Sequence, residues 1–186
     1  MADIPAHQIC EKIAEIETKH NVTVLYACEA GSRAWGFASP DSDYDVRFIY
    51  VPRLNHYLNV HVPGIPGQPV AFEPRDVIEA PINSDLDITG WELRKALRLA
   101  WQSNPALLEW LTSPIEYWKS TQLSKLRDIS FRCMRPEKLY HHYLGMATRN
   151  YHEHLKGDEV RYKKYLYVLR PLLACRWINL NITKGR

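Results

Sequence analysis

The sequence predicts an α+β fold in which a small mixed β-sheet, over about residues 20–90, is followed by an all-helical part over 90–186. Three observations support this prediction. Two short β-rich runs lie within the first fifty residues, a Gly-Ser pair separates them, and the spacing of apolar residues becomes helical after Ile88. A chain of 186 residues is long enough for one domain, or for one small domain with helical additions.

The composition is that of an ordinary globular protein. Hydrophobic residues make up 46% of the chain and charged residues 24%, which excludes a disordered tail, a collagen-like fibre and a low-complexity segment. The 24 Lys and Arg residues against 21 Asp and Glu residues leave a formal net charge of +3. So small a charge does not by itself indicate nucleic-acid binding, and only a local cluster of cations could do so.

Cysteine spacing and hydropathy bear on the cellular compartment. The cysteines lack the Cys-x-x-Cys or Cys/His spacing of a zinc site, so we expect free thiols in a reducing compartment. The first residues do not form a signal peptide, and no apolar stretch reaches the roughly 18–20 residues that span a bilayer. These features predict a soluble cytoplasmic protein without a membrane partner. The four cysteines are Cys10, Cys28, Cys133 and Cys175.

The first fifty residues predict one helix and two strands. Isoleucines recur at near-helical spacing over residues 4–19, which indicates an amphipathic helix that ends at Asn21. Residues 22–28 and 44–51 are β-rich runs of the length and composition of strands. Between them we expect a short turn or helix over 33–36.

The next segment combines an irregular excursion with two further strands. Residues 53–75 are rich in Gly and Pro, and the sequence leaves open whether they form a lid or a partner-binding loop. Residues 76–82 and 85–88 predict two strands, and the short Asn83-Ser84 turn between them makes the pair antiparallel.

The second half of the chain predicts helices. Thr89 and Glu92 have the spacing of a capping box, so we expect a helix with Thr89 as its N-cap. Asn104-Pro105 and Ser113-Pro114 each place a capping residue before a proline, which predicts helices from about 105 and about 114. Three more helices are expected over residues 123–129, 136–157 and 160–180, and Pro171 should kink the last.

An acidic pair stands at the start of the second strand. Asp43 and Asp45 are two residues apart, and residues at that spacing on a strand point to the same face. Two neighbouring carboxylates repel each other and destabilise the fold unless a cation lies between them. Because hard oxygen ligands select Mg²⁺ or Mn²⁺, we interpret the pair as a metal site.

A phosphate site is predicted just before this pair. Gly31 lets the backbone come close to an anion, and the N–H groups of a helix start can hold phosphate together with the Ser32 hydroxyl. A phosphate cradle beside a two-carboxylate metal site indicates an enzyme that uses a nucleoside triphosphate.

A third carboxylate would complete the site. Acids alternate with apolar residues in Asp85-Leu86-Asp87-Ile88, so both acids can face the metal site. We prefer Asp87 because it lies deeper in the strand, and Asp85 is the alternative. In a two-metal mechanism Asp43 and Asp45 would bridge both ions, while Asp87 would hold the second ion and help to deprotonate the attacking hydroxyl.

These residues, taken in order, resemble the DNA polymerase β-type nucleotidyltransferase superfamily. Gly-Ser comes first, then Ser-Asp-x-Asp, whose first Asp is eleven residues after Ser32, then an Asp on a later strand. Over nearly its whole length the chain is similar to the RNA-ligase-associated, YcgL-like branch of predicted nucleotidyltransferases (RlaP). Members of this branch usually continue further, and the sequence leaves open whether the natural chain extends beyond Arg186. The closer resemblance lies in Ser42–Tyr50, Asp87–Leu97, Ser103–Pro105 with Glu109–Leu111, and Lys163–Leu173.

The resemblance implies a nucleotidyltransferase core over residues 1–90 and a helical region over 91–186 that completes the nucleotide and acceptor cleft. It also implies that the last helix faces the nucleotide. The implied site residues are Gly31 and Ser32 for the triphosphate, Asp43, Asp45 and Asp87 for the metal, and Lys163, Lys164 and Arg170 on the last helix.

Some of these assignments have alternatives. Lys163 and Arg170 are seven residues apart and share a helix face, where cations could neutralise a polyphosphate. For Lys163 and Lys164 the alternative is that they lie on a solvated helix face without a ligand. Arg33 could stack over the nucleotide or simply extend to solvent. Ser42 could be a turn cap or a site residue, and the resemblance favours the site.

The function implied is the transfer of a nucleoside monophosphate from an NTP to a hydroxyl, with Mg²⁺ or Mn²⁺ and release of pyrophosphate. An RNA end is the favoured acceptor because the branch is associated with RNA ligases, and a protein side chain or a small molecule are the alternatives. A non-catalytic nucleotide-binding or antitoxin-like module would use the same fold. A metal-dependent phosphohydrolase is a third option, but it usually needs more His and Asp ligands.

Overall fold

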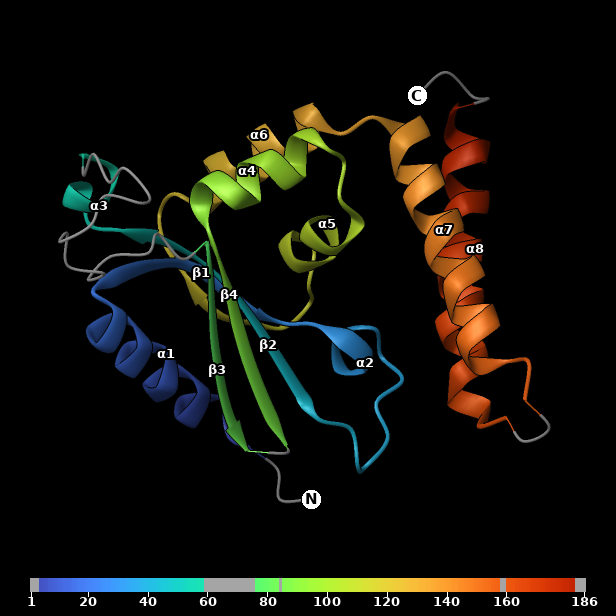
Figure 1. Ribbon diagram of the computed structural model, residues 1–186, viewed down its shortest axis with the longest axis horizontal. Helices are drawn as coiled ribbons and strands as arrows, with labels where there is room; N and C mark the ends of the chain where they lie inside the picture. Colours follow the sequence, from blue (N-terminus) through green and yellow to red (C-terminus); the bar gives the residue numbers. More distant parts are fainter. Residues whose placement is uncertain (1–3, 59–75, 84, 158–159, 183–186) are drawn as a thin grey trace, which may run out of the picture. The chain divides into compact units, whose positions relative to one another are not determined.

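The computed structural model describes residues 4–58, 76–83, 85–157 and 160–182. Within them, strands form one mixed sheet in the order β3-β4-β2-β1-β5 (Figure 1). Strand β2 runs parallel to β4, and the other neighbours are antiparallel, which confirms the predicted α+β class. The strands are β1 (Val22–Glu29), β2 (Tyr44–Pro52), β3 (Val77–Asn83), β4 (Leu86–Glu92) and β5 (Glu116–Lys119).

Helices precede, interrupt and follow these strands along the chain. The long predicted helices over residues 136–157 and 160–180 are confirmed, and Pro171 lies inside the second of them. The helices are α1 (Ala6–His20), α2 (Gly31–Ala34), α3 (Leu54–Leu58), α4 (Leu93–Trp101), α5 (Pro105–Leu111), α6 (Leu123–Cys133), α7 (Pro136–His154) and α8 (Tyr162–Ile182).

The chain packs as two compact units. The first contains Met1–Arg98 and Glu109–Asp128, and therefore holds the whole sheet and α1, whereas α6 is divided between the two units. The second contains Leu99–Leu108 and Ile129–Arg186, in which α7 and α8 pack around Leu139, Tyr143, Cys175 and Ile178. None of the described helices is both long and apolar enough to cross a membrane.

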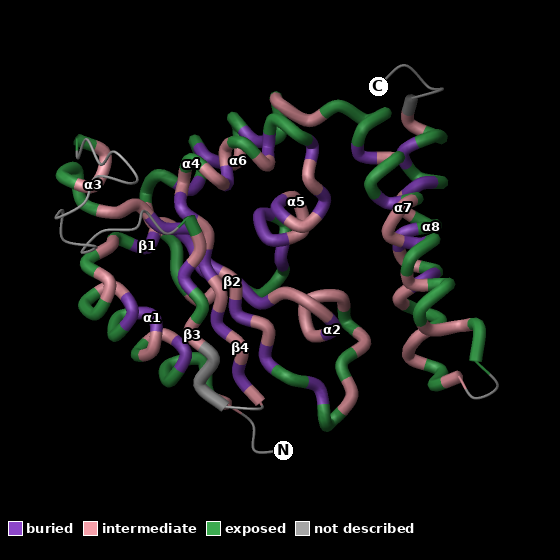
Figure 2. Tube along the Cα trace, in the orientation of Figure 1, coloured by how far each residue is buried: buried purple, intermediate pink, exposed green. Residues whose placement is uncertain are grey.

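One face of the sheet is covered by α1. Its isoleucines Ile9, Ile13 and Ile16 are buried against sheet residues that include Val46 and Phe48. Figure 2 shows buried positions recurring along α1. Complete burial of such a side chain stabilises the fold by about 1.5–3 kcal/mol. Because side chains alternate along a strand, the residues between these sheet positions point to the opposite face. That opposite face carries the candidate site.

The predicted capping box at Thr89 is wrong. Thr89 lies inside β4, which pairs with β2 as far as Tyr50 opposite Glu92, and α4 begins only at Leu93. Gly90 permits this close pairing, because a Cβ there would lie 2.2 Å from the Phe48 ring on the neighbouring strand. The Glu92 carboxylate instead accepts a hydrogen bond from the Arg94 N–H at 2.9 Å.

The helix expected from about residue 114 is also wrong. Residues 116–119 form β5, the edge strand beside β1. The backbone of β1 has donors and acceptors to satisfy at this edge, and the Glu29 N–H donates to the Ile115 carbonyl at 3.0 Å. Ser113 does not cap a helix, since its hydroxyl donates to the Glu29 carbonyl at 2.6 Å.

The remaining expectations concern the segment between β2 and β4. Strands β3 and β4 are antiparallel as predicted. The start of the Gly/Pro-rich excursion forms the short helix α3, which the sequence did not indicate. Residues 59–75, and with them the question of a lid or binding loop, lie outside the described residues, as does Ser84 of the predicted turn.

Candidate active site

The parallel pairing of β2 and β4 places two of the predicted carboxylates side by side. Asp45 is the register partner of Asp87, and both lie on the face opposite α1. The competing acid, Asp85, lies just outside β4 and its carbonyl accepts the Tyr44 N–H at 2.8 Å. The register therefore favours Asp87 over Asp85 as the partner of Asp45.

Arg47 joins these two carboxylates. Its Nη2 atom lies 2.9 Å from Asp45 Oδ1 and 2.8 Å from Asp87 Oδ2, so one nitrogen serves both acids. Its Nη1 atom donates to the carbonyl oxygens of Val46 at 3.1 Å and Asp87 at 3.2 Å. The Arg47 side chain is only 18% exposed. The two carboxylates thus converge on a cationic position that a guanidinium occupies.

The electrostatics around Asp45 reflect this crowding. Burial raises the pKa of Asp45, the guanidinium of Arg47 acts in the opposite direction, and the negative charges of Asp87 and Asp43 raise the pKa further. Asp43 itself is exposed and precedes β2 by one residue. Asp45 and Asp87 together carry one negative charge more than the Arg47 guanidinium neutralises, and Asp43 adds another nearby, which favours a further cation.

These donors fit a divalent metal in part. Among the residues that the structure describes, no group of three or more His, Cys, Asp and Glu side chains is arranged to hold a metal ion. However, Asp45 and Asp87 already direct hard oxygen atoms at one cationic position, which is the donor type that Mg²⁺ and Mn²⁺ prefer. Asp43 would complete the set only by turning toward them.

Gly31 lies directly against the Asp45 carboxylate. Its φ angle is +60°, and a Cβ atom built on it would lie 2.1 Å from Asp45 Oδ2. The Ala30 N–H donates to the Asp45 carbonyl at 2.8 Å and fixes this approach. Ser32 follows in α2 and is buried. The predicted phosphate-binding turn and the predicted metal ligand are therefore neighbours.

Arg33 and Ser42 both make hydrogen bonds with neighbouring residues of the chain. The Arg33 guanidinium lies 3.7 Å above the Tyr44 ring, and it donates to the Tyr44 hydroxyl at 2.8 Å and to the Ser42 carbonyl at 3.3 Å. The Ser42 hydroxyl accepts the Ser39 N–H at 2.9 Å and closes the turn before β2. These contacts hold α2 against the start of the strand that carries Asp45.

Glu29 is a candidate site residue that the sequence did not indicate. It is fully buried, it accepts the Asp45 N–H at 2.8 Å, and it accepts the Tyr117 hydroxyl at 2.6 Å. Burial raises the pKa of Glu29, and these two hydrogen bonds partly offset the rise. The available signal was a carboxylate at the end of an apolar strand, two residues before Gly31.

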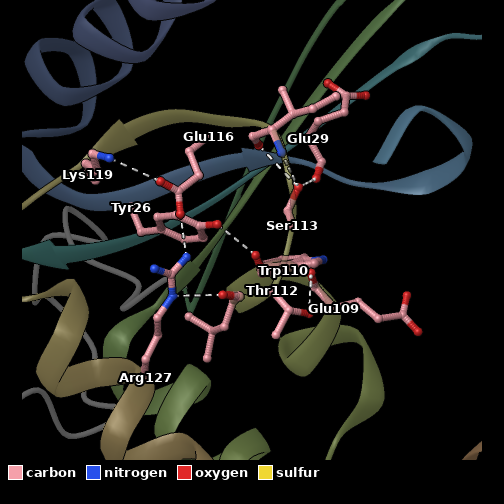
Figure 3. Close-up of polar contacts among 11 residues, drawn as sticks. Tyr26, Glu29, Glu109, Trp110, Thr112, Ser113, Glu116, Lys119 and Arg127 are labelled. Carbon is pink, nitrogen blue, oxygen red and sulfur yellow. Dashed lines mark hydrogen bonds and ion pairs between the residues drawn. The ribbon is translucent and has the colours of Figure 1, made fainter. Parts of the chain in front are cut away.

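The end of α5 and the residues that follow it support the strand that ends at Glu29 (Figure 3). Ser113 donates to the Glu29 carbonyl, and the Tyr26 hydroxyl donates to the Trp110 carbonyl at 2.8 Å. Arg127 of α6 donates to the Leu111 carbonyl at 2.8 Å and pairs with Glu116 of β5. This network holds the end of β1, which is Glu29 itself and which Gly31 follows two residues later.

The predicted cations on the last helix belong to the second unit. Lys163, Lys164 and Arg170 are half-buried on α8. The Lys164 ammonium lies 3.5 Å from His154 Nε2 and 4.9 Å from the centre of the Tyr167 ring. Their assignment to the nucleotide stays a prediction.

Comparison with known proteins assigns the family. The model of the family described as "RlaP: RNA repair pathway DNA polymerase beta family" matches residues 6–184. The Bacillus subtilis (strain 168) protein named "Uncharacterized protein YcgL" is 50% identical over 172 residues, which cover 92% of this chain and 62% of that protein. This chain thus spans less than two thirds of that relative's length. As its motifs predicted, the chain belongs to the RlaP family, an RNA repair pathway family of DNA polymerase β type.

Proposed function

We propose that the protein is a metal-dependent nucleotidyltransferase that moves a nucleoside monophosphate from an NTP to a hydroxyl group. The observation that carries this proposal is the convergence of Asp45 and Asp87 on one cationic position, directly beside Gly31. The family supports the same reaction class, since its description places it with DNA polymerase β. The enzyme would be located in the cytoplasm.

Each residue of the site has a role in this reaction. Gly31 and Ser32 bind the triphosphate, whose phosphates can approach the backbone where no Cβ intervenes. Asp43, Asp45 and Asp87 would hold Mg²⁺ or Mn²⁺, which supplies Lewis-acid stabilisation of the charge on the phosphates. Lys163, Lys164 and Arg170 would add positive charge around the same substrate.

The transfer needs no reactant other than the NTP and the acceptor hydroxyl. The acceptor oxygen forms a bond to the α-phosphorus, the bond from that phosphorus to the bridging oxygen breaks, and pyrophosphate leaves. Asp87 accepts the proton of the attacking hydroxyl, because it is the more exposed of the two paired carboxylates, at 48% against 34% for Asp45. Asp45 lies against Gly31 and is therefore the better placed of the two to hold a metal ion that binds the triphosphate.

We favour an RNA end as the acceptor. The support is the family description, which names an RNA repair pathway. Basic residues also accumulate toward the end of the chain, where an RNA strand could be neutralised: Arg161, Lys163, Lys164, Arg170, Arg176, Lys184 and Arg186.

A non-catalytic nucleotide-binding module is the second candidate. The ion pairs of Arg47 favour it, because they neutralise part of the acidic charge of Asp45 and Asp87 without any metal. Under this alternative the protein would bind an NTP and leave it intact.

The two candidates differ in the product they form. We would incubate the protein with RNA, Mg²⁺ or Mn²⁺ and each α-³²P-labelled NTP, and follow the label into RNA. We expect wild type to label RNA and Asp87→Asn to lower the rate at least about a hundredfold. Asp85→Asn is the matched control, since it removes a neighbouring acid from the same segment, and it should keep most of the activity. NTP binding without any transfer would support the non-catalytic module instead.

A further inference from the structure

The Arg47 guanidinium occupies the position between Asp45 and Asp87 at which their oxygens could otherwise hold a metal ion. A single nitrogen, Nη2, lies within 2.9 Å of an oxygen of Asp45 and an oxygen of Asp87. A Mg²⁺ ion bound by the same two oxygens would lie about 2.0–2.1 Å from each. An ion at the position of the nitrogen would clash with it, so the two cations compete for the same position between these oxygens.

The other oxygens of the two carboxylates have neighbours of their own. Asp45 Oδ2 faces Gly31, where even a Cβ atom would be only 2.1 Å away. Asp87 Oδ1 accepts a hydrogen bond from the Thr89 hydroxyl at 3.3 Å. The oxygens that face Arg47 are therefore the pair that the two acids can share around a common cation.

The guanidinium is held firmly and carries a permanent charge. It bonds to two carboxylates and to two backbone carbonyls, and arginine does not lose its proton in proteins. A metal ion that displaced it would leave a largely buried cation without these partners, which is costly. Displacement becomes favourable only when another anion is present to receive the guanidinium.

We propose that the Arg47 guanidinium competes with divalent metal for Asp45 and Asp87. It prevents metal binding until a polyphosphate binds the guanidinium in place of the two carboxylates. This inference rests on the proposed function, because it concerns the same carboxylates and the same triphosphate. Phosphates held at Gly31 would lie beside Asp45, within the same part of the site, and a guanidinium binds phosphate oxygens bidentately. Metal and nucleotide would then bind cooperatively, and free metal would bind weakly.

Metal binding can be measured without any turnover. We would titrate Mn²⁺ into the protein and follow free Mn²⁺ by electron paramagnetic resonance, with and without an NTP analogue that has a methylene group between its α- and β-phosphorus atoms. For wild type we expect weak binding of Mn²⁺ alone and at least about tenfold tighter binding with the analogue. For Arg47→Gln we expect Mn²⁺ alone to bind at least about tenfold more tightly than to wild type, with little further gain from the analogue.

Two further variants keep the result interpretable. Arg53→Gln removes a positive charge from an exposed arginine just beyond β2, whose Nε donates to Asn21, and should leave Mn²⁺ binding unchanged. If Arg47→Gln does not fold, Arg47→Lys retains a charge but loses the second nitrogen, which donates to the Val46 and Asp87 carbonyls, and it should give an intermediate gain. Thermal melting of each variant reports whether it folds.

The outcomes separate this inference from the proposed function. Equal or weaker Mn²⁺ binding by the Arg47 variants would overturn the competition, even if wild type transfers nucleotides. An absence of Mn²⁺ binding by wild type and variants, with and without the analogue, would overturn it as well. Tighter binding by Arg47→Gln that Asp45→Asn abolishes would support the competition, even if no nucleotide transfer is ever observed.

Discussion

At the scale of single residues, Gly31 is a position that tolerates little change. Its left-handed backbone and its contact with the Asp45 carboxylate both require the absence of a side chain. The two demands can be separated, because Gly36 has a φ angle of +80° but no atom within 4 Å of the place a Cβ would occupy.

We therefore expect different results from the same substitution at the two glycines. Gly36→Ala should lower the free energy of unfolding by about 1–2 kcal/mol through backbone strain alone and keep nucleotide transfer. Gly31→Ala should cost more stability and lower transfer about a hundredfold, because Asp45 must move. Denaturant unfolding and the RNA-labelling rate measure both effects, and an active Gly31→Ala variant would contradict this account of the site.

Glu29 should act on Asp45 through the backbone. Glu29→Ala leaves the Asp45 N–H and the Tyr117 hydroxyl without this acceptor in a buried position, and should cost about 2–4 kcal/mol of unfolding free energy. Glu29→Gln retains an oxygen acceptor for Asp45 and removes the buried charge, so its cost should be much smaller. Urea unfolding at neutral pH compares the two variants, and equal losses would refute this role.

The raised pKa of Glu29 also predicts a pH dependence. The folded protein holds this proton more tightly than the unfolded chain, so the associated stability is present at acid pH. It is lost as the pH rises from the ordinary pKa of Glu through the raised value. Glu29→Gln should remove that decline, and unfolding curves recorded between acid and neutral pH would show whether the slope of wild type becomes shallower in the variant.

The residue scale also shows what a sequence can indicate about this site. Gly31, Asp45 and Asp87 could be proposed because their spacing along the chain carries the motif, and the β2–β4 register brings them together. Arg47 and Glu29 could not, because the importance of each depends on which side chain or backbone N–H lies opposite it in the folded sheet.

At the scale of elements, local signals predicted most of the first unit and failed where pairing with a distant strand decided the structure. The runs over residues 22–28 and 44–51 are strands by composition alone. Thr89 has good capping chemistry, but pairing of β4 with β2 outweighs it. Residues 116–119 lack a long β-rich run and become β5 only because the edge of β1 is available.

Arg127 should stabilise this short edge strand. It bonds to Glu116 and to the Leu111 carbonyl, so it ties β5 to the end of α5. Arg127→Ala should lower the free energy of unfolding by about 1–2 kcal/mol, toward the lower end for charged hydrogen bonds because the pair is partly exposed. Lys119→Ala is the control, since Lys119 also contacts Glu116 but is 71% exposed, and thermal melting should barely change.

The same pair predicts a loss of stability in acid. The hydrogen bond from Arg127 holds the pKa of Glu116 below its ordinary value. Its stabilising contribution is present above the ordinary pKa of Glu and is lost as the pH falls through the lowered value. Stability curves of wild type and Arg127→Ala should therefore converge at low pH, and a constant difference at every pH would exclude the ion pair as the cause.

At the scale of the whole molecule, the chain comprises a sheet-bearing unit with the carboxylates and a second unit with the cationic helix α8. The two long helices were predictable from local signals, and α7 begins at Pro136 as expected. The assignment of residues 1–90 and 91–186 to catalytic core and cleft remains a prediction about function, as does the role of α8.

That role can be tested on the cations of α8. Arg170→Gln should raise the KM for NTP about tenfold, since a guanidinium that binds phosphate is lost, while leaving the fold intact. Lys138→Gln removes an exposed cation from α7 in the same unit and serves as the control. Equal KM values for the two variants would place Arg170 outside the nucleotide site.

The central claim is that Asp45 and Asp87 support attack at the α-phosphorus of an NTP, and the position of a radioactive label tests it most directly. Parallel reactions with RNA and the same NTP, labelled at either the α- or the γ-phosphorus, should carry only the α-label into RNA and release the γ-label as pyrophosphate. Transfer of the γ-label to any acceptor, or its release as inorganic phosphate, would contradict the account and indicate a phosphotransferase or a phosphohydrolase.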